Sequence, residues 1–340
     1  MKKVLFIESR TGGDFTMDAV WAGLVKRHGA NNVIDFPPKQ KHREGVPCST
    51  GDAEKDYGAE RRSLCYTGEK LPYLDAQGIK LLLAAGQIER IFVDERAETY
   101  EEYLKVGAQH FDVPVVVIAG HDRFWGDPVQ LMMGYGTKLE ARFLDNWRPA
   151  YGDLPRTFPM SYATNFDHFW NVEKREEYLS KKLYDVFFMG YNSHPDRAAL
   201  VDHLSQKYSG DANCLFVEKR PNTMDSFVRK SEYFRMMAQS RVCINLRGGA
   251  ECGKALRFYE IPYVGSCMLS QRFEGRQVAP FEDLKHCLYF DTVAELDNLV
   301  ETLLNSDVFR ERIAKTGHEH AMLNHTDTAR VDYIYRCLGR

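Results

Sequence analysis

The sequence predicts an α/β protein built from two Rossmann-like domains that face each other across a cleft. Short apolar runs alternate with helical patterns in both halves of the chain, as in parallel sheets covered by helices on both faces. The 340 residues are too many for one ordinary core and enough for two domains of usual size. An irregular and then charged stretch at 158–182 separates the two alternations, which predicts a linker there.

Each half contributes its own strands and helices. In the first half we expect strands at 4–7, 32–36, 91–94 and 113–119, and helices at 15–28, 75–85 and 99–109. In the second half we expect strands at 186–189, 214–217, 242–246, 266–269 and 288–290, and helices at 173–182, 198–208, 231–238, 253–261 and 294–304. The segment 37–63 lacks the apolar pattern and is rich in basic residues. It is either a solvated loop or a lid that contacts an anionic acceptor.

Composition argues against several classes of protein. The formal net charge of -3 gives no global reason to expect a polyanionic partner. No apolar run approaches the ~20 residues that a membrane span needs. The run after Met1 ends at Glu8, too early for a signal peptide. The eight cysteines are scattered without a C-x-x-C pair, so we expect a cytoplasmic protein with reduced cysteines and no structural zinc site.

A glycine-rich segment, GGAECGKA from Gly248 to Ala255, follows the apolar run at 242–246. A strand, then G-x-x-x-x-G-K, then a helix is typical of a P-loop, which binds nucleotide phosphates. A P-loop needs Ser or Thr after its lysine to bind Mg²⁺, and this chain has Ala255 there. The second metal ligand would be Asp291, which follows a weak strand. A P-loop-like phosphotransferase is therefore an alternative and not the main prediction.

The same segment predicts a phosphate site of another kind. Glycines let the backbone approach a ligand, and a helix N-terminus presents unpaired N–H groups to an anion. Lys254 and Arg257 would share a helix face, and the Arg257 guanidinium can bind a diphosphate with two hydrogen bonds. Glu260 follows at the next three-residue step and suits the paired hydroxyls of a ribose. The pattern indicates a nucleotide-sugar site without a metal ligand, although Arg257 and Glu260 could equally form a surface ion pair.

Residues 240–269, SRVCINLRGGAECGKALRFYEIPYVGSCML, resemble the donor-binding segment of GT-B glycosyltransferases. The similarity is to the C-terminal domain of the spore-maturation-type and family-1-like groups. In that domain an apolar strand and a Gly-rich loop precede an Arg-Phe/Tyr-Glu helix and a small-residue turn. The similarity continues through 273–277, 309–317 and 325–330. The resemblance implies that Arg257 contacts the donor diphosphate and Glu260 the donor ribose.

The resemblance also implies a division of the chain. Residues 1–163 would form an N-terminal Rossmann-like acceptor domain, and residues 183–322 a C-terminal Rossmann-like domain that binds the nucleotide-sugar donor. Residues 323–340 carry apolar side chains at helical spacing between Val331 and Leu338, which predicts a helix packed on a core. In GT-B proteins such a last helix packs back toward the N-terminal domain.

Ligands of parallel sheets bind at the carboxyl ends of the strands, and four such loops in this chain carry polar or glycine-rich sequences. The residues that we expect on the donor side are Gly190, Asn192, Arg247, Gly248, Gly249, Lys254, Arg257 and Glu260. The residues that we expect on the acceptor side are Arg10, Gly12, Gly13 and Arg123.

The candidate catalytic residues come from the first half. His121 and Asp122 follow the fully apolar strand at 113–119 and would face the cleft. An inverting enzyme needs a base that deprotonates the acceptor hydroxyl, and a histidine oriented by a carboxylate can do this near neutral pH. Asp122 could instead cap the helix that begins near Asp127. Asp14 is the other candidate base, and a retaining reaction stays open.

The resemblance thus implies an enzyme of class EC 2.4 that moves a sugar from a nucleotide sugar, such as a UDP-sugar, to an acceptor hydroxyl. We expect no metal, and no cofactor beyond the donor substrate. The acceptor stays open among a glycan, a lipid-linked glycan, a protein, a small molecule and a modified nucleobase in DNA. The alternatives are the P-loop-like phosphotransferase and a non-catalytic nucleotide-sugar-binding protein.

Overall fold

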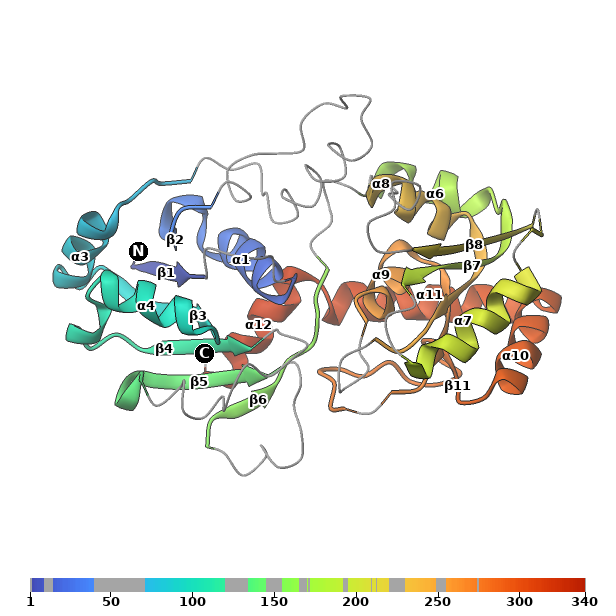
Figure 1. Ribbon diagram of the computed structural model, residues 1–340. Coiled ribbons are helices and arrows are strands. Elements are labelled where there is room, and N and C mark those ends of the chain that lie inside the picture. The colour runs from blue at the N-terminus through green and yellow to red at the C-terminus, as the bar shows by residue number, and fades with distance from the viewer. Residues whose placement is uncertain are drawn as a thin grey trace.

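The computed structural model contains two parallel β-sheets, each with helices packed against it (Figure 1). The residues that the structure describes are 2–8, 15–39, 71–119, 134–144, 155–164, 170, 172–191, 195–208, 210–211, 213–219, 230–248, 255–273 and 275–339. The α/β fold class with two Rossmann-like sheets, predicted from the alternation of apolar runs, is confirmed.

The first sheet has six parallel strands in the order β2-β1-β3-β4-β5-β6. The strands are β1 (Lys3–Ile7), β2 (Val33–Phe36), β3 (Ile88–Asp94), β4 (Val115–Ala119), β5 (Leu139–Leu144) and β6 (Thr157–Pro159). The four predicted strands are confirmed, and nearly all of their residues are buried, as expected for a parallel sheet covered on both faces. The sequence does not predict β5, in which charged and apolar residues mix, or β6, which has only three residues.

In the described part of the first half, helices α1 (Phe15–His28), α3 (Ala76–Ala84) and α4 (Ala97–Lys105) pack against the sheet. The carboxylate of Asp75 caps α3 by accepting a hydrogen bond from the Gly78 backbone N–H at 2.7 Å. The sequence predicts that α4 reaches residue 109, but the helix ends at Lys105. Gly107 adopts a left-handed conformation with φ of 71°, and a 3₁₀ turn follows at Ala108–His110.

The second sheet has five parallel strands in the order β11-β10-β9-β7-β8. The strands are β7 (Tyr184–Tyr191), β8 (Cys214–Lys219), β9 (Ser240–Asn245), β10 (Cys267–Gln271) and β11 (Leu288–Phe290). The chain first moves outward from β7 to β8 and then returns to β9 on the other side of β7. Ligands of such sheets bind at the carboxyl ends of the two strands where the direction changes, here β7 and β9.

Six helices of the second half are α6 (Val172–Ser180), α7 (Pro195–Tyr208), α8 (Lys230–Ala238), α9 (Arg257–Val264), α10 (Val293–Asn305) and α11 (Asp307–Asn324). The predicted linker at 158–182 is therefore wrong at both ends, because β6 joins the first sheet and α6 packs on α8. The helix predicted at 253–261 begins only at Arg257 and continues to Val264, where Gly265 ends it with φ of 89°. Lys254, which the prediction placed on the same helix face as Arg257, lies outside the described residues.

The last helix, α12 (Asp327–Cys337), packs against α1 of the first half (Figure 1). Gly23 makes this possible, because a Cβ on Gly23 would lie only 2.4 Å from the Asp327 carbonyl oxygen. Lys26 forms an ion pair with the Asp327 carboxylate at 2.7 Å, and Val331 and Ile334 are buried in the core of the first half. The helical spacing of these apolar residues is confirmed.

Two segments that connect the halves run next to each other. The Thr164 backbone N–H donates to the His325 carbonyl at 2.8 Å, and the Asp327 N–H donates to the Thr164 carbonyl at 2.9 Å. The buried Arg330 guanidinium donates to the Tyr162 carbonyl at 3.1 Å. These bonds fix the two crossings to each other, so the halves are joined by a paired connection and not by a single strand of chain.

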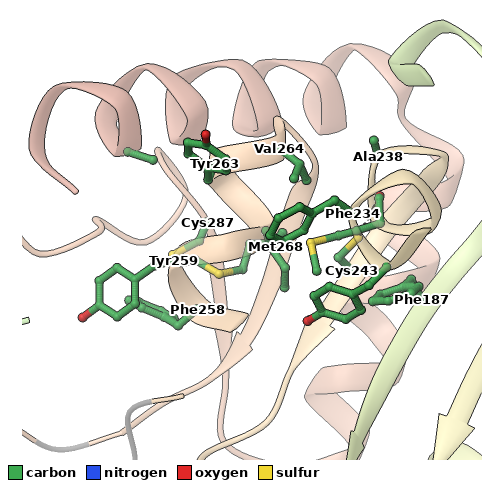
Figure 2. Packing of buried hydrophobic residues seen from close by; sticks show 14 of the residues in the cluster. Phe187, Phe234, Ala238, Cys243, Phe258, Tyr259, Tyr263, Val264, Met268 and Cys287 are labelled. Atoms are coloured by element: carbon green, nitrogen blue, oxygen red, sulfur yellow. Dashed lines mark hydrogen bonds between the residues drawn. The ribbon is translucent and has the colours of Figure 1, made fainter. Parts of the chain in front are cut away.

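The core of the second half is rich in aromatic and sulfur-containing side chains (Figure 2). Phe187 of β7 and Phe234 of α8 lie on one side of it, and Phe258 and Tyr259 of α9 on the other. All four side chains are fully buried. This packing fixes α8 and α9 against the sheet, and both helices carry residues of the candidate site.

Candidate functional site

The candidate site lies at the carboxyl edge of the second sheet, between the ends of β7 and β9. Gly190 is the second-to-last residue of strand β7, and a Cβ there would lie 2.6 Å from Nη2 of Arg257 and 3.1 Å from Nη2 of Arg197. The absence of a side chain at Gly190 therefore admits two guanidinium groups to the same place. The predicted site residues Gly190 and Arg257 come together here, and Arg197 joins them.

The surroundings of the two arginines favour the binding of an anion. Arg197 is 6% exposed, and burial followed by the nearby charge of Arg257 lowers its pKa to about 10. Nε and Nη2 of Arg197, and Nε and Nη1 of Arg257, are buried and have no hydrogen-bond partner among the described residues. The Arg257 guanidinium also lies 5.1 Å over the ring of Phe188. Two like charges with unused buried donors are costly unless a ligand satisfies them.

Both arginines lie at the N-termini of their helices, which also favours the binding of an anion. Arg197 is in the first turn of α7, and Arg257 is the first residue of α9. The N-terminus of a helix carries a partial positive charge, so a cation there is unfavourable by itself. Two helix N-termini and two guanidinium groups near Gly190 together make a strongly electropositive site. Such a site suits a diphosphate, which offers several oxygens to two bidentate donors.

Sequence reasoning did not select Arg197. The signal was present, because Pro195 at the first position of a helix after a strand, followed closely by an arginine, marks a helix N-terminus with an unfavourable cation. The spatial proximity of Arg197 to Arg257, 60 positions later in the chain, is a property of the sheet order that the sequence pattern does not display.

Glu260 lies one helical turn after Arg257 and is 3% exposed. Its Oε2 accepts a hydrogen bond of 3.0 Å from the Tyr233 hydroxyl, which α8 brings to α9. The alternative of a surface ion pair between Arg257 and Glu260 is therefore wrong, because the carboxylate is buried. A buried acceptor next to the paired arginines suits the hydroxyls of a ribose attached to the diphosphate.

The chain that leaves β9 is held in place before it enters the glycine-rich loop. The amide of Asn245 donates to Ser270 Oγ at 3.0 Å, and the Arg247 backbone N–H donates to Gln271 Oε1 at 3.1 Å. Arg247 and Gly248, both predicted donor-side residues, thus lie at the carboxyl ends of β9 and β10. Their backbone enters the loop from the edge that carries the two arginines.

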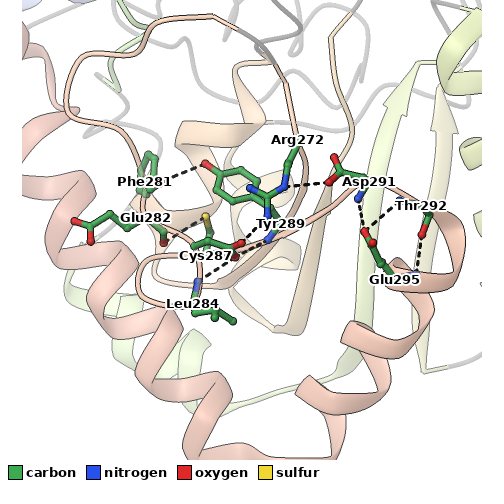
Figure 3. A network of polar contacts seen from close by, with 10 residues as sticks. Arg272, Phe281, Glu282, Leu284, Cys287, Tyr289, Asp291, Thr292 and Glu295 are labelled. Carbon is green, nitrogen blue, oxygen red and sulfur yellow. Dashed lines mark hydrogen bonds and ion pairs between the residues drawn. The ribbon is translucent and has the colours of Figure 1, made fainter.

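Beyond β10, Arg272 ties the neighbouring loops together (Figure 3). Its guanidinium contacts the Asp283 carboxylate at 2.7 Å and the Asp291 carboxylate at 3.1 Å. Asp291 is the residue that the P-loop alternative requires as a metal ligand. In the structure it is an exposed partner of Arg272 beside the N-cap of α10, which is a structural role.

The remaining predicted residues lie outside the described parts of the chain: Arg10, Gly12, Gly13, Asp14, His121, Asp122, Arg123, Asn192, Gly249 and Lys254. The strands that lead to them are described. β1 ends at Ile7 and β4 at Ala119, both in the parallel first sheet, so these loops leave the carboxyl edge of that sheet. Most of the polar segment 37–63 also lies outside the described residues.

Within the described ranges, no group of three or more His, Cys, Asp or Glu side chains is arranged to hold a metal ion. None of the helices that the structure describes is long and apolar enough to cross a membrane.

A family of proteins described as glycosyl transferase-like matches residues 197–336, somewhat less than half of the chain. The match begins at Arg197 and includes Arg257, Glu260 and all of α12 except its last residue, Cys337. No curated protein sequence matches the chain.

Solved structures resemble the chain over its whole length. A glycosyltransferase from Rickettsia africae is 12% identical, with a TM-score of 0.61 over 99% of this chain and 98% of that chain. Anabaena HepE in complex with UDP is 12% identical, with a TM-score of 0.57 over 99% of both chains. A sucrose-phosphate synthase from Thermosynechococcus elongatus is 12% identical, with a TM-score of 0.53 over 100% and 99% of the two chains. The chain therefore has the GT-B glycosyltransferase fold, and its residues 197–336 match the glycosyl transferase-like family.

Proposed function

We propose that this protein is a glycosyltransferase that moves a sugar from a nucleoside diphosphate sugar to an acceptor hydroxyl. The observation that carries the proposal is the pair formed by the buried Arg197 and the partly buried Arg257, which Gly190 admits to one place at the switch point of the second sheet. The GT-B fold supports it, as does the match of residues 197–336 to the glycosyl transferase-like family. Anabaena HepE, one protein of this fold, has been solved with UDP and with UDP-glucose.

In this proposal the arginines bind the diphosphate and Glu260 binds the ribose. The two guanidinium groups supply unused N–H donors, and the start of α9 adds its helix dipole. Glu260 lies one helical turn after Arg257 in α9. In the nucleotide sugar, the ribose is attached to the diphosphate on the side away from the transferred sugar, so the two residues would bind neighbouring parts of the donor. Arg247 and Gly248 bring backbone to the same edge, and Gly249, Lys254 and Asn192 stay candidates for further donor contacts.

The same arginines would assist the reaction itself. The donor sugar leaves a nucleoside diphosphate whose negative charge grows as the glycosidic bond breaks. Arg197 and Arg257 are already in place and partly desolvated, so they would stabilise that charge without a metal ion and without reorganisation. We therefore propose a metal-independent reaction with no cofactor beyond the donor.

The acceptor would bind at the first half of the chain. Residues 1–163 form the proposed acceptor domain and residues 183–322 the donor domain, with 323–340 returning to the first. His121 with Asp122, or Asp14, is the proposed base, and Arg10, Gly12, Gly13 and Arg123 are proposed contacts to the acceptor. A glycan, a lipid-linked glycan, a protein, a small molecule or a modified nucleobase are the acceptor classes to be tested.

The test is a screen of UDP-, GDP-, ADP- and dTDP-sugars against the full chain by calorimetry, together with a turnover assay that detects the released nucleotide. Arg197→Ala and Arg257→Ala should each weaken binding of the nucleoside diphosphate by about 2–5 kcal/mol, because each substitution leaves a phosphate charge in the site without its guanidinium partner. Arg241→Ala is the matched control, since Arg241 pairs with Asp185 at the opposite, amino end of β9. Unchanged affinity in both folded site variants would remove the assignment.

The alternatives give different results in the same screen. A P-loop-like phosphotransferase would need Mg²⁺ and would transfer phosphate, and the exposed pairing of Asp291 with Arg272 does not favour it. A non-catalytic nucleotide-sugar-binding protein would bind the donor and release no nucleotide with any acceptor class. Binding with turnover supports the main proposal over both.

A further inference from the structure

Tyr233 connects the two residues that the proposed function assigns to the donor nucleotide. It lies on α8, is 7% exposed, and donates the 3.0 Å hydrogen bond to Glu260 Oε2. The positive charge of Arg257 also acts on the phenol and opposes the effect of Glu260 on the pKa of Tyr233. One neutral hydroxyl thus lies between the proposed ribose acceptor and the proposed diphosphate donor.

The position of the Tyr233 hydroxyl is fixed by packing. The ring centroid lies 5.8 Å from that of Phe187 and 5.7 Å from that of Phe234, both fully buried. Figure 2 shows Phe187 and Phe234 in the core beside α9. A tyrosine has only two side-chain torsions, and a ring held on both sides retains little freedom in either. The hydroxyl is therefore a rigid reference point for whatever it contacts.

Glu260 needs such a reference point. The terminal torsion of a glutamate is broad, so helix geometry alone does not fix the plane of its carboxylate. Burial and the charge of Glu260 raise the pKa of Tyr233 well above its usual value, so the phenol keeps its proton and remains a donor. Its hydrogen bond to Oε2 sets the orientation of the whole carboxylate.

We propose that Tyr233 is a positioning residue that orients the Glu260 carboxylate toward the donor ribose, and that it thereby determines discrimination between ribose and 2′-deoxyribose nucleotides. The inference rests on the proposed function. Tyr233 itself touches no part of the nucleotide in this scheme. It acts through Glu260, so removing the Tyr233 hydroxyl should reduce the contribution of the ribose 2′-hydroxyl to the binding affinity. The other contacts to the nucleotide should stay in place.

The experiment compares Tyr233→Phe with the wild-type chain. Affinities are measured by calorimetry for whichever of UDP, GDP or ADP binds most tightly, and for its 2′-deoxy form. Tyr233→Phe should weaken binding of the ribose form about 10-fold, at the lower end of the range for one hydrogen bond to a charged group, because the carboxylate stays in place and loses only its orientation. Binding of the 2′-deoxy form should change less than about 2-fold, so the ratio between the two nucleotides should fall.

Tyr208→Phe is the matched control. Tyr208 is also 7% exposed, but it lies at the far end of α7 from Arg197, and its hydroxyl has no hydrogen-bond partner among the described residues. This variant should keep the wild-type ratio. If Tyr233→Phe weakens binding of both nucleotides by the same factor, or of neither, the ratio of their affinities is unchanged and the proposal is overturned. Equal losses would show that Tyr233 has a purely structural role.

A second variant removes dependence on a single substitution. In a Glu260→Gln background, Tyr233→Phe should not reduce the ratio further, because the carboxylate that it orients is absent. An undiminished further effect would overturn the link through Glu260. If none of the three ribonucleotides binds the wild-type chain, the proposed function itself fails. If they bind and the ratio does not respond to Tyr233→Phe, only the inference about Tyr233 fails.

Discussion

Substituting alanine for Gly190 tests the arginine pair without removing either arginine. The new Cβ would lie 2.6 Å from Arg257 Nη2, 3.1 Å from Arg197 Nη2 and 3.2 Å from Phe188 Cζ. Contacts below 3.0 Å essentially never occur, so the Arg257 guanidinium must move until ordinary contact is restored at 3.4 Å or more. The two closest atoms are the ends of flexible arginine side chains, so their movement can relieve most of the crowding without a change in the fold.

The magnitude follows from what the displaced guanidinium would have done. A shift of this size breaks the alignment of a bidentate contact, which loses about one charge-assisted hydrogen bond, worth roughly 1.5–3 kcal/mol. Gly190→Ala should therefore weaken UDP binding about 10- to 150-fold. The stability of the fold should change by less than about 1 kcal/mol, because alanine suits a strand better than glycine and offsets the crowding.

Calorimetry with UDP and thermal unfolding of the same sample separate the two effects. Uridine, which has no phosphate, serves as the control ligand, and its weak binding measured by ligand-observed NMR should be the same in both proteins. A folded variant that binds UDP as tightly as the wild type would refute the idea that these arginines hold the diphosphate. Equal loss of uridine binding would place the effect elsewhere in the site.

Further predictions concern the arginine, the metal, the helix contact and a buried lysine. Arg257→Lys should recover only part of the affinity lost in Arg257→Ala, because an ammonium lacks the bidentate fork; calorimetry with UDP measures this. EDTA should leave sugar transfer unchanged, and a loss that Mg²⁺ restores would contradict the metal-independent proposal. Gly23→Ala should destabilise the fold by about 1–3 kcal/mol in urea unfolding, because its Cβ would collide with the Asp327 carbonyl of α12. Burial lowers the pKa of Lys182 to about 8, so above that pH the folded state binds fewer protons than the unfolded state. The melting temperature of the wild type, relative to Lys182→Met, should therefore rise between pH 8 and pH 10.

The architecture could be predicted from the sequence because it depends on local patterns. Apolar runs such as 115–119 are unbroken and β-branched, and they become the central buried strands of a parallel sheet. Prediction failed where tertiary packing overrides the local pattern. β5 contains charged residues, among them Glu140, which pairs with the buried Arg90 of β3 at 2.7 Å. The sequence alone does not distinguish a charged residue that pairs with a side chain of another strand from a charged residue that is exposed to solvent.

The site was predicted in part for the same reason. Arg257 and Glu260 are close in sequence and share a helix, so spacing alone relates them. The error in the start of α9 arose because glycine-rich sequence was taken as the first turn of the helix, whereas Ala255 and Leu256 still precede it. Arg197 and Tyr233 come from other helices, and only the order of the strands brings them to Arg257.

The helix dipole offers a physical rule that could have found Arg197. A helix N-terminus repels cations, and natural helices place acidic residues in their first turns, as α10 does with Glu295 and α12 with Asp327. α7 and α9 each carry an arginine in the first turn as well as an acidic residue, Asp196 in α7 and Glu260 in α9, and the two arginines are buried or partly buried. An arrangement that costs stability in the free protein is retained where a ligand offsets the cost. Two first-turn arginines whose guanidinium groups meet at a single glycine therefore favour the proposed diphosphate site.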